Sequence, residues 1–201
     1  IGGEGLLLDL GARLLGKEKV QRLLPLLRSP SLCTPISSAG RLFDCVSALC
    51  GLSLTSSYEG EAAMRLEDCY RSGVPGPDYP FDIIKRHSLY ILSWHDCIKA
   101  VLKDLEKGMG PEVVSSRFHR GLATGVRKMC IQLREETGIN KAALSGGVFQ
   151  NKVFTELTLA QLKAAGFEVL LRREIPPGDG GISLGQAVIA DRLIGLKKIR
   201  F

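Results

Sequence analysis

Two glycine-rich turns in the last third of the sequence carry the residues best suited to binding chemistry. The first turn, "SGG", follows the apolar run "AAL" and contains Ser145, Gly146 and Gly147, with the amide Asn151 shortly after it. At the start of a helix the first backbone N–H groups have no partner within the helix and the dipole is positive, so anions are favoured there. Bare glycines would let a phosphate approach, and Ser145 and Asn151 could add hydrogen bonds. The same pattern is equally typical of a tight turn in which glycine only supplies a positive φ.

The second turn, "GDGG", presents Asp179 between flexible glycines. A carboxylate in this setting can bind a hard or borderline cation or a ribose hydroxyl, or it can form an Asx turn or a helix cap. Neither the P-loop pattern nor the Rossmann glycine fingerprint occurs in the chain, which excludes the familiar phosphate-binding loops.

The elements around the two turns are predicted to place them side by side. From residue 141 the order is strand, glycine turn, amphipathic helix and second strand, and Gly166 ends the helix. This order predicts a βαβ unit with parallel strands and a ligand beyond their carboxyl ends. The "GDGG" turn follows the second strand and opens the last helix, so both turns should line one cleft.

Upstream of this unit the sequence is mainly helical. The stretch "RLFDCVSALC" has apolar residues at helical spacing, ends at Gly51 and carries Asp44 on its opposite face. The stretch "RSGVPGPDYPFD" predicts a loop, because prolines and glycines interrupt regular structure. A long helix is predicted from Pro111 to just before Gly138.

The histidines offer no complete metal site of their own. The chain has three, and none forms an HxxH or HxxxH pair. His119, beside Phe118 on the long helix, is expected to be packed or hydrogen-bonded, although a ligand role stays open. A nucleophilic pair of cysteine and histidine also stays open, with no spacing that indicates one.

Composition indicates a soluble globular protein. The 201 residues are 45% hydrophobic and 24% charged, enough to bury a sizeable core. No apolar run is long enough to span a bilayer, and the charged residues among the first leucines argue against a signal peptide. The six cysteines contain no CxxC pair and favour reduced thiols in the cytoplasm. The net charge of +6 is spread along the chain, so nucleic-acid binding is not favoured.

Four stretches together resemble one family. They are "SSAGRLFDCVSALCGL", "SYEGEAAMRLE", "FHRGLA" and "ALSGGVFQNKVFTELTLAQLKAAGFEVLLRREIPPGDGGISLGQAVIA". They resemble the carboxyl-terminal region of HypF, the carbamoyltransferase of NiFe-hydrogenase maturation, which is itself similar to the TsaD family. The resemblance implies an α/β fold: a helix-rich lobe of the actin-like, ribonuclease H-like superfamily with a βαβ unit in its last third.

The resemblance implies that residues 1–201 are the second lobe of a HypF/TsaD-like domain. Its expected parts are a helical nucleotide-side segment at 1–72, a loop at 73–82, a helical segment at 83–140 and a nucleotide- and metal-binding βαβ segment at 141–195. The implied reaction transfers a carbamoyl group from carbamoyl-adenylate, made from ATP, to the carboxyl-terminal cysteine of a HypE-like partner.

The same resemblance assigns roles to single residues. Gly146, Gly147 and Asn151 correspond to the nucleotide loop, and Asp179 corresponds to a ligand of a divalent metal, which could be iron, zinc or magnesium. On the ribose and adenosine side the corresponding residues are Asp44, Gly60 and Glu61. No catalytic residue is assigned.

The chain also departs from the family pattern, because the HxxxH pair and the YrdC-like domain that would lie upstream are absent from it. We therefore expect the 201 residues alone to bind nucleotide weakly and to transfer nothing. Two alternatives stay open: an O-carbamoyltransferase acting on an antibiotic or a threonylcarbamoyl-type enzyme acting on tRNA, and a non-catalytic docking lobe.

Overall fold

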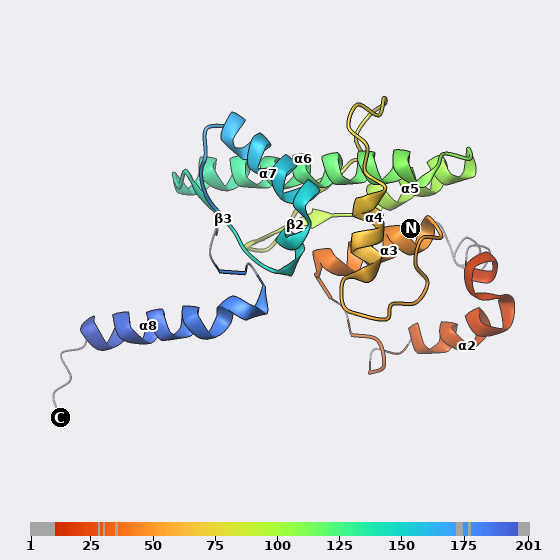
Figure 1. Cartoon of the computed structure of the whole chain (residues 1–201), viewed down its shortest axis with the longest axis horizontal. Coiled ribbons are helices and arrows are strands. Elements are labelled where there is room, and N and C mark those ends of the chain that lie inside the picture. Colours follow the sequence, from red (N-terminus) through yellow and green to blue (C-terminus); the bar gives the residue numbers. More distant parts are fainter. Residues whose placement is uncertain are drawn as a thin grey trace.

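The structure is a computed structural model that describes residues 11–27, 29, 31–34, 36–171, 175–176 and 178–196. Helices dominate it, and the strands are few and short (Figure 1). The helices are α2 (Lys17–Leu27), α3 (Ala39–Leu49), α4 (Glu61–Asp68), α5 (His95–Glu106), α6 (Pro111–Thr137), α7 (Lys152–Ala164) and α8 (Ile182–Leu196), with two short 3-10 helices, η1 (Gly147–Gln150) and η2 (Asp179–Gly181). The strands are β1 (Asp82–Arg86), β2 (Leu89–Ser93), β3 (Lys141–Leu144) and β4 (Glu168–Leu171).

Helix α6 is the element on which the others pack. It has 27 residues, with Pro111 in its first turn and Gly138 at its end in the left-handed region, at φ 70°. The Gly138 N–H donates to the Arg134 carbonyl over 2.8 Å and closes the last turn. Helices α4, α5 and α7 and both strands of the β1–β2 pair contact it. The predicted long helix is therefore confirmed.

The main core is aromatic and lies where α3, α6 and α7 meet. The rings of Phe43 and Phe118 pack edge to face with centroids 4.9 Å apart, and Phe154 lies 5.8 Å from Phe43. Each of the three is 2% exposed or less. Burying one such ring contributes about 1.5–3 kcal/mol. These contacts fix helix α3 against α6 and α7.

The predicted βαβ unit is confirmed. Strands β3 and β4 are parallel, with Lys141 opposite Glu168 and Leu144 opposite Leu171. Helix α7 connects them and ends before Gly166, which takes φ 83° as the left-handed stop. A small second core beneath this sheet contains Leu144, Leu162 and Phe167.

The segment 83–140 was expected to be helical, and this expectation is wrong at its start. Residues 82–93 form an antiparallel hairpin, in which Ile84 pairs with Ile91 across the two strands. β-Branched and aromatic side chains favour this pairing. The turn is hard to recognise because His87 adopts φ 55° where a glycine would be usual. The predicted loop before the hairpin is confirmed over residues 73–81, and β1 begins at Asp82.

Two glycines of α6 let the hairpin and its loop approach the helix backbone. A Cβ on Gly121 would lie 2.2 Å from the Tyr79 carbonyl oxygen, and one on Gly125 would lie 3.0 Å from the Phe81 Cβ. Gly121 is therefore restricted to glycine by the Tyr79 backbone, whereas a methyl group at Gly125 would require the Phe81 and Leu92 side chains to shift slightly. Helices α2, α3 and α4 agree with the helical prediction for 1–72, of which residues 1–10 lie outside the described part.

Helix α8 extends away from the body of the molecule (Figure 1). Its large apolar side chains are exposed, namely Ile182, Leu184, Val188, Ile189, Leu193 and Ile194. Among the described helices, none combines the length and the apolar character that crossing a bilayer requires.

Candidate functional site

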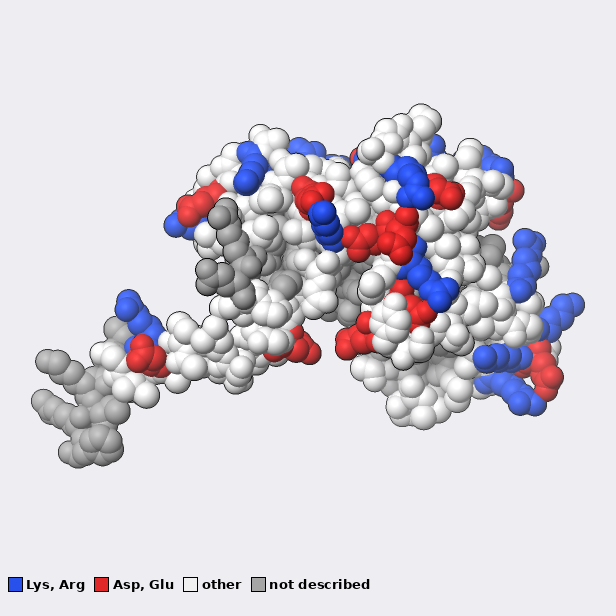
Figure 2. Space-filling view, in the orientation of Figure 1, with Lys and Arg blue, Asp and Glu red and all other residues white. Residues whose placement is uncertain are grey.

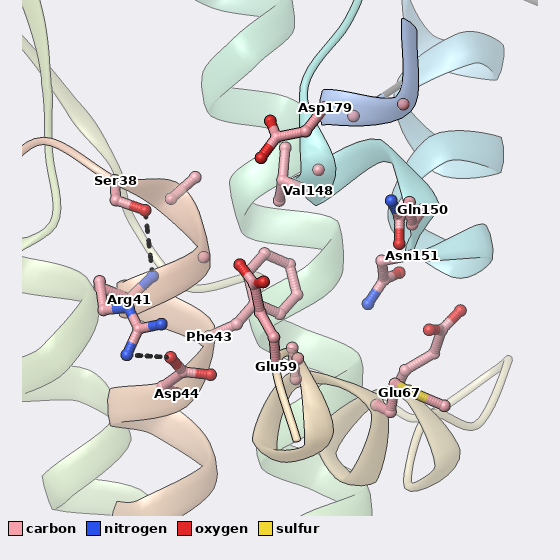
Figure 3. A pocket seen from close by; sticks show the side chains of 18 residues that line it. Ser38, Arg41, Phe43, Asp44, Glu59, Glu67, Val148, Gln150, Asn151 and Asp179 are labelled. Carbon is pink, nitrogen blue, oxygen red and sulfur yellow. Dashed lines mark hydrogen bonds and ion pairs between the residues drawn. The ribbon is translucent and has the colours of Figure 1, made fainter. Parts of the chain in front are cut away.

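A pocket of about 820 Å³ opens between the amino end of α3, the loop before α4 and the two glycine turns (Figure 3). Its volume lies within the usual range for small-molecule sites. Four separate segments of the sequence contribute its walls. The lining residues are Ser38, Ala39, Gly40, Arg41, Phe43, Asp44, Glu59, Gly60, Ala63, Met64, Glu67, Gly147, Val148, Gln150, Asn151, Gly178, Asp179 and Gly180.

The two glycine turns lie next to each other. A Cβ built on Gly178 would lie 3.6 Å from the Gly147 Cα and 3.0 Å from the Gln150 Nε2. Gly146 takes φ 103° immediately before η1. The predicted approach of the two turns at one end of the parallel strands is therefore confirmed, whereas the ligand between them stays a prediction.

The structure brings five of the predicted site residues to the pocket and leaves three outside its lining. Those at the pocket are Asp44, Gly60, Gly147, Asn151 and Asp179, and those outside it are Ser145, Gly146 and Glu61. Ser145 and Gly146 directly precede the lining residue Gly147, so they shape the turn that leads into the wall.

Asp44 faces the pocket from α3 beside the basic residue Arg41. The guanidinium lies 3.2 Å from the Asp44 carboxylate, and both side chains border the cavity (Figure 3). The helix begins at the N-cap Ser38, whose hydroxyl accepts from the Arg41 N–H. The predicted position of Asp44 opposite the apolar face of its helix is thus confirmed, and sequence reasoning missed its pairing with Arg41.

Glu61 stabilises its own loop and helix. Its Oε2 accepts from the Ser57 N–H at 2.6 Å and from the Ser57 hydroxyl at 2.8 Å, and Arg65 donates to its Oε1. The Ser57 backbone and then its hydroxyl hold the pKa of the Glu61 carboxyl below its ordinary value. The carboxylate that this loop presents to the pocket is instead Glu59 (Figure 3). Between the two lies Gly60 at φ 84°, which reverses the chain.

The amino end of α7 is already satisfied by protein groups. The Asn151 Oδ1 accepts from the Phe154 N–H at 2.7 Å, and the Glu67 Oε1 accepts from the Val153 N–H at 3.0 Å. The expectation of an anion on the first N–H groups of this helix is therefore wrong for these two. The amides at the start of η1 are the remaining candidates, because the first N–H groups of a 3-10 helix also lack partners within it.

His119 is a structural residue at the back of this wall, as expected. It is fully buried, its Nδ1 donates to the Ser115 carbonyl at 2.8 Å, and its Nε2 lies 3.2 Å from the Asn151 Nδ2. Burial lowers the pKa of His119 to about 4, although the Ser115 carbonyl opposes the change. The imidazole is accordingly neutral at pH 7.

The pocket is acidic. Within the described part of the chain its lining has four carboxylates, from Asp44, Glu59, Glu67 and Asp179, and a single guanidinium, that of Arg41. Figure 2 shows acidic side chains gathered around the hollow. A phosphate placed here requires a cation or basic groups in addition to the backbone donors.

The described residues offer only part of a metal-binding site. Asp179 offers one carboxylate at the pocket, but among the described residues no group of three His, Cys, Asp or Glu side chains could hold a metal ion. The residues present therefore fit a metal only if further ligands come from elsewhere.

The fold is a helix-rich α/β lobe of the actin-like type, whose pocket is built at the ends of parallel strands. A family model described as the second subdomain of the Kae1-like domain of a carbamoyltransferase matches residues 7–186. The chain belongs to the HypF carbamoyltransferase family.

Relatives agree with this assignment. The carbamoyltransferase HypF of Rhodobacter capsulatus is 38% identical over 157 residues, or 77% of this chain and 19% of the relative. That of Synechocystis is 35% identical over 150 residues, or 75% of this chain and 19% of the relative. The chain thus spans about a fifth of the length of these relatives.

Solved structures agree as well. A crystal structure of full-length HypF in its phosphate- and nucleotide-bound form superimposes with a TM-score of 0.85 at 33% identity, covering 91% of this chain and 29% of that one. The HypF of T. kodakarensis superimposes with a TM-score of 0.71 at 24% identity, covering 92% of this chain and 24% of that one, which supports the fold alone.

Proposed function

We propose that this chain forms one wall of a carbamoyl-transfer site that binds carbamoyl-adenylate. The observation that carries the proposal is the close approach of Gly147 and Gly178 at an open pocket, in a chain of the HypF family. A full-length relative has been solved with phosphate and nucleotide bound, which supports a nucleotide as the ligand.

In this proposal the bare turns receive the phosphate of the adenylate. The first N–H groups of η1, beside Gly147, would donate to its oxygens, since glycine leaves the backbone accessible. Asp44 would accept from a ribose hydroxyl, and Arg41 would keep that carboxylate from repelling the phosphate. Gly60 and Glu59 would border the adenosine side.

The acceptor is proposed to be the carboxyl-terminal cysteine of a HypE-like partner. Its thiol loses a proton, the sulfur attacks the carbamoyl carbon, and the bond from that carbon to the phosphate oxygen breaks, so that AMP leaves with the electron pair. Cys50 and Cys97 are poor nucleophiles, because burial raises the pKa of Cys50 to about 12 and also raises that of Cys97.

Asp179 would hold a divalent metal together with ligands from an HxxxH-bearing lobe, and the metal would polarise the carbamoyl carbonyl. Such a lobe and a YrdC-like domain are the proposed neighbours. Because the wall described here has an acidic lining and one pocket cation, we expect the isolated chain to bind nucleotide weakly and to leave thiols unmodified.

The test is a titration of the intact chain with AMP in the presence of Mg²⁺, followed by amide NMR. The expected result is a shift of the Gly147, Val148 and Gly180 amides with a millimolar dissociation constant, weakened severalfold in Asp179→Ala. Asp191→Ala on the exposed helix α8 is the matched control. No shift at these amides up to saturating nucleotide would overturn the proposal.

Titrations of the same chain with RNA and with the partner separate the alternatives. A tRNA-modifying enzyme predicts salt-dependent RNA binding, which the acidic lining of the pocket does not favour. A purely docking lobe predicts that Asp179→Ala leaves both nucleotide and partner affinity unchanged.

A further inference from the structure

Asn151 connects η1 to α7, two elements of the pocket wall. It is at once the residue that ends η1 and the N-cap of α7, with its Oδ1 on the Phe154 N–H. Thr155 in the same first turn of α7 donates from its hydroxyl to the Phe149 carbonyl at 2.9 Å, which ties the helix back to the turn. The position of residues 147–150 therefore depends on how Asn151 is held.

The other end of the Asn151 amide contacts His119. Because the Ser115 carbonyl can only accept, the His119 Nδ1 must carry the proton, so Nε2 is the acceptor. The Asn151 Nδ2 then donates to Nε2 over 3.2 Å. This bond and the Phe154 cap together admit only one orientation of the amide.

The type of residue at position 151 is informative. Serine and aspartate cap helices about as well as asparagine does, but asparagine carries its acceptor and its donors on separate atoms, whereas serine has one hydroxyl for both and aspartate has no donor. A helix cap needs only the acceptor. The donor is used toward His119, which lies in an otherwise aromatic setting of Phe43, Phe118 and Tyr70.

We propose that His119 is a positioning residue: through its hydrogen bond to Asn151 it fixes the turn 147–150 and thereby the backbone donors of the pocket. The observation behind it is geometric, since the contact joins the central helix α6 to the residue that caps both η1 and α7. The bond is buried, with Asn151 8% exposed and His119 fully enclosed, so water does not replace it readily.

Amide hydrogen exchange on the intact chain tests the positioning directly. Asn151→Ser keeps a capping oxygen but removes the amide that donates to His119, and His119→Phe keeps an aromatic ring but removes the acceptor. Both variants are expected to exchange the amides of residues 148–150 about fivefold faster, as loss of one buried hydrogen bond implies. His119→Gln, whose amide can donate to Ser115 and accept from Asn151, should restore most of the protection.

Phe118→Leu is the matched control, because it loosens the same core without touching Asn151. Phe118→Leu should speed amide hydrogen exchange only at residues whose exchange requires global unfolding. Wild-type exchange at 148–150 in Asn151→Ser, or a His119→Gln variant no better than His119→Phe, would overturn the inference.

A second readout rests on the proposed function: AMP affinity should fall in Asn151→Ser and His119→Phe and recover in His119→Gln. If wild-type chain does not bind AMP while the exchange results are as expected, the proposed ligand fails and the positioning role stands. If AMP binds equally to all variants, the positioning role fails and the proposed ligand stands.

Discussion

The guanidinium of Arg41 lies 3.2 Å from the carboxylate of Asp44, one turn apart on α3, and both border the acidic pocket. Among the lining residues that the structure describes, Arg41 is the only one with a basic side chain. It therefore sets how much negative charge an entering ligand meets.

Arg41→Ala should weaken AMP binding by about threefold to tenfold, because the phosphate would face four carboxylates without a nearby guanidinium. Titration at low and high salt checks this, and the difference from wild type should shrink as salt is added. Lys152→Ala serves as the control, since its exposed side chain pairs with Glu156 and does not line the pocket. Unchanged affinity in Arg41→Ala would remove Arg41 from the site.

Glu61→Gln should lower the melting temperature and leave the pocket charge unchanged. The substitution weakens the charged hydrogen bonds from Ser57 and Arg65 that order the loop before α4. Glu59→Gln should show the opposite pattern, with the melting temperature unchanged and cation-dependent nucleotide binding altered. Thermal unfolding and AMP titration of both variants check this, and a fall in stability in Glu59→Gln alone would reverse the assignment.

Unfolding should become easier as the pH falls from about 6.5 toward 4, because of His119. Its folded pKa of about 4 lies below the ordinary value of 6.5, so in this window the unfolded chain binds a proton that the folded chain does not. The contribution of neutral His119 to the free energy of unfolding is fully present above pH 6.5, the ordinary pKa of histidine. It declines by roughly 2 kcal/mol by pH 5.

Denaturant unfolding of wild type and His119→Phe between about pH 7 and pH 5 measures this difference. In His119→Phe, the part of the pH dependence of the unfolding free energy that comes from the histidine should be lost. Equal slopes in the two proteins would mean that His119 is not held neutral in the folded state. His95→Gln is the control for loss of a histidine at another position.

Gly121→Ala should destabilise the chain by about 1–3 kcal/mol, because the new methyl group would press on the Tyr79 backbone, which cannot move as a flexible side chain does. Gly185→Ala is the matched helix variant. No atom lies within 4 Å of its added Cβ, so it should leave stability unchanged or raise it by up to about 1 kcal/mol. Chemical denaturation distinguishes the two outcomes.

Local signals account for what sequence alone predicts here. The ends of α3, α6 and α7 are marked by Gly51, Gly138 and Gly166, all with positive φ, and the parallel pairing of β3 with β4 follows from the element order. The hairpin lacks such a mark, because His87 takes the left-handed conformation in its turn.

The remaining features of the pocket depend on contacts between distant residues. Glu67 reaches the Val153 N–H from 86 positions away, and no sequence pattern records that this N–H is occupied. Within the loop before α4, the reversal at Gly60 decides that Glu59 rather than Glu61 borders the cavity. Charge and residue type identify candidates in such a loop, but the direction of each side chain follows from backbone geometry.

The close approach of Gly147 and Gly178 couples two separate stretches of the sequence. A library randomised at position 178 alone should return chiefly glycine and alanine, since only the end of the Gln150 side chain can yield to a methyl group. Bulkier residues should be recovered only alongside compensating changes at 150 or 147, so selection acts on these codons as a group.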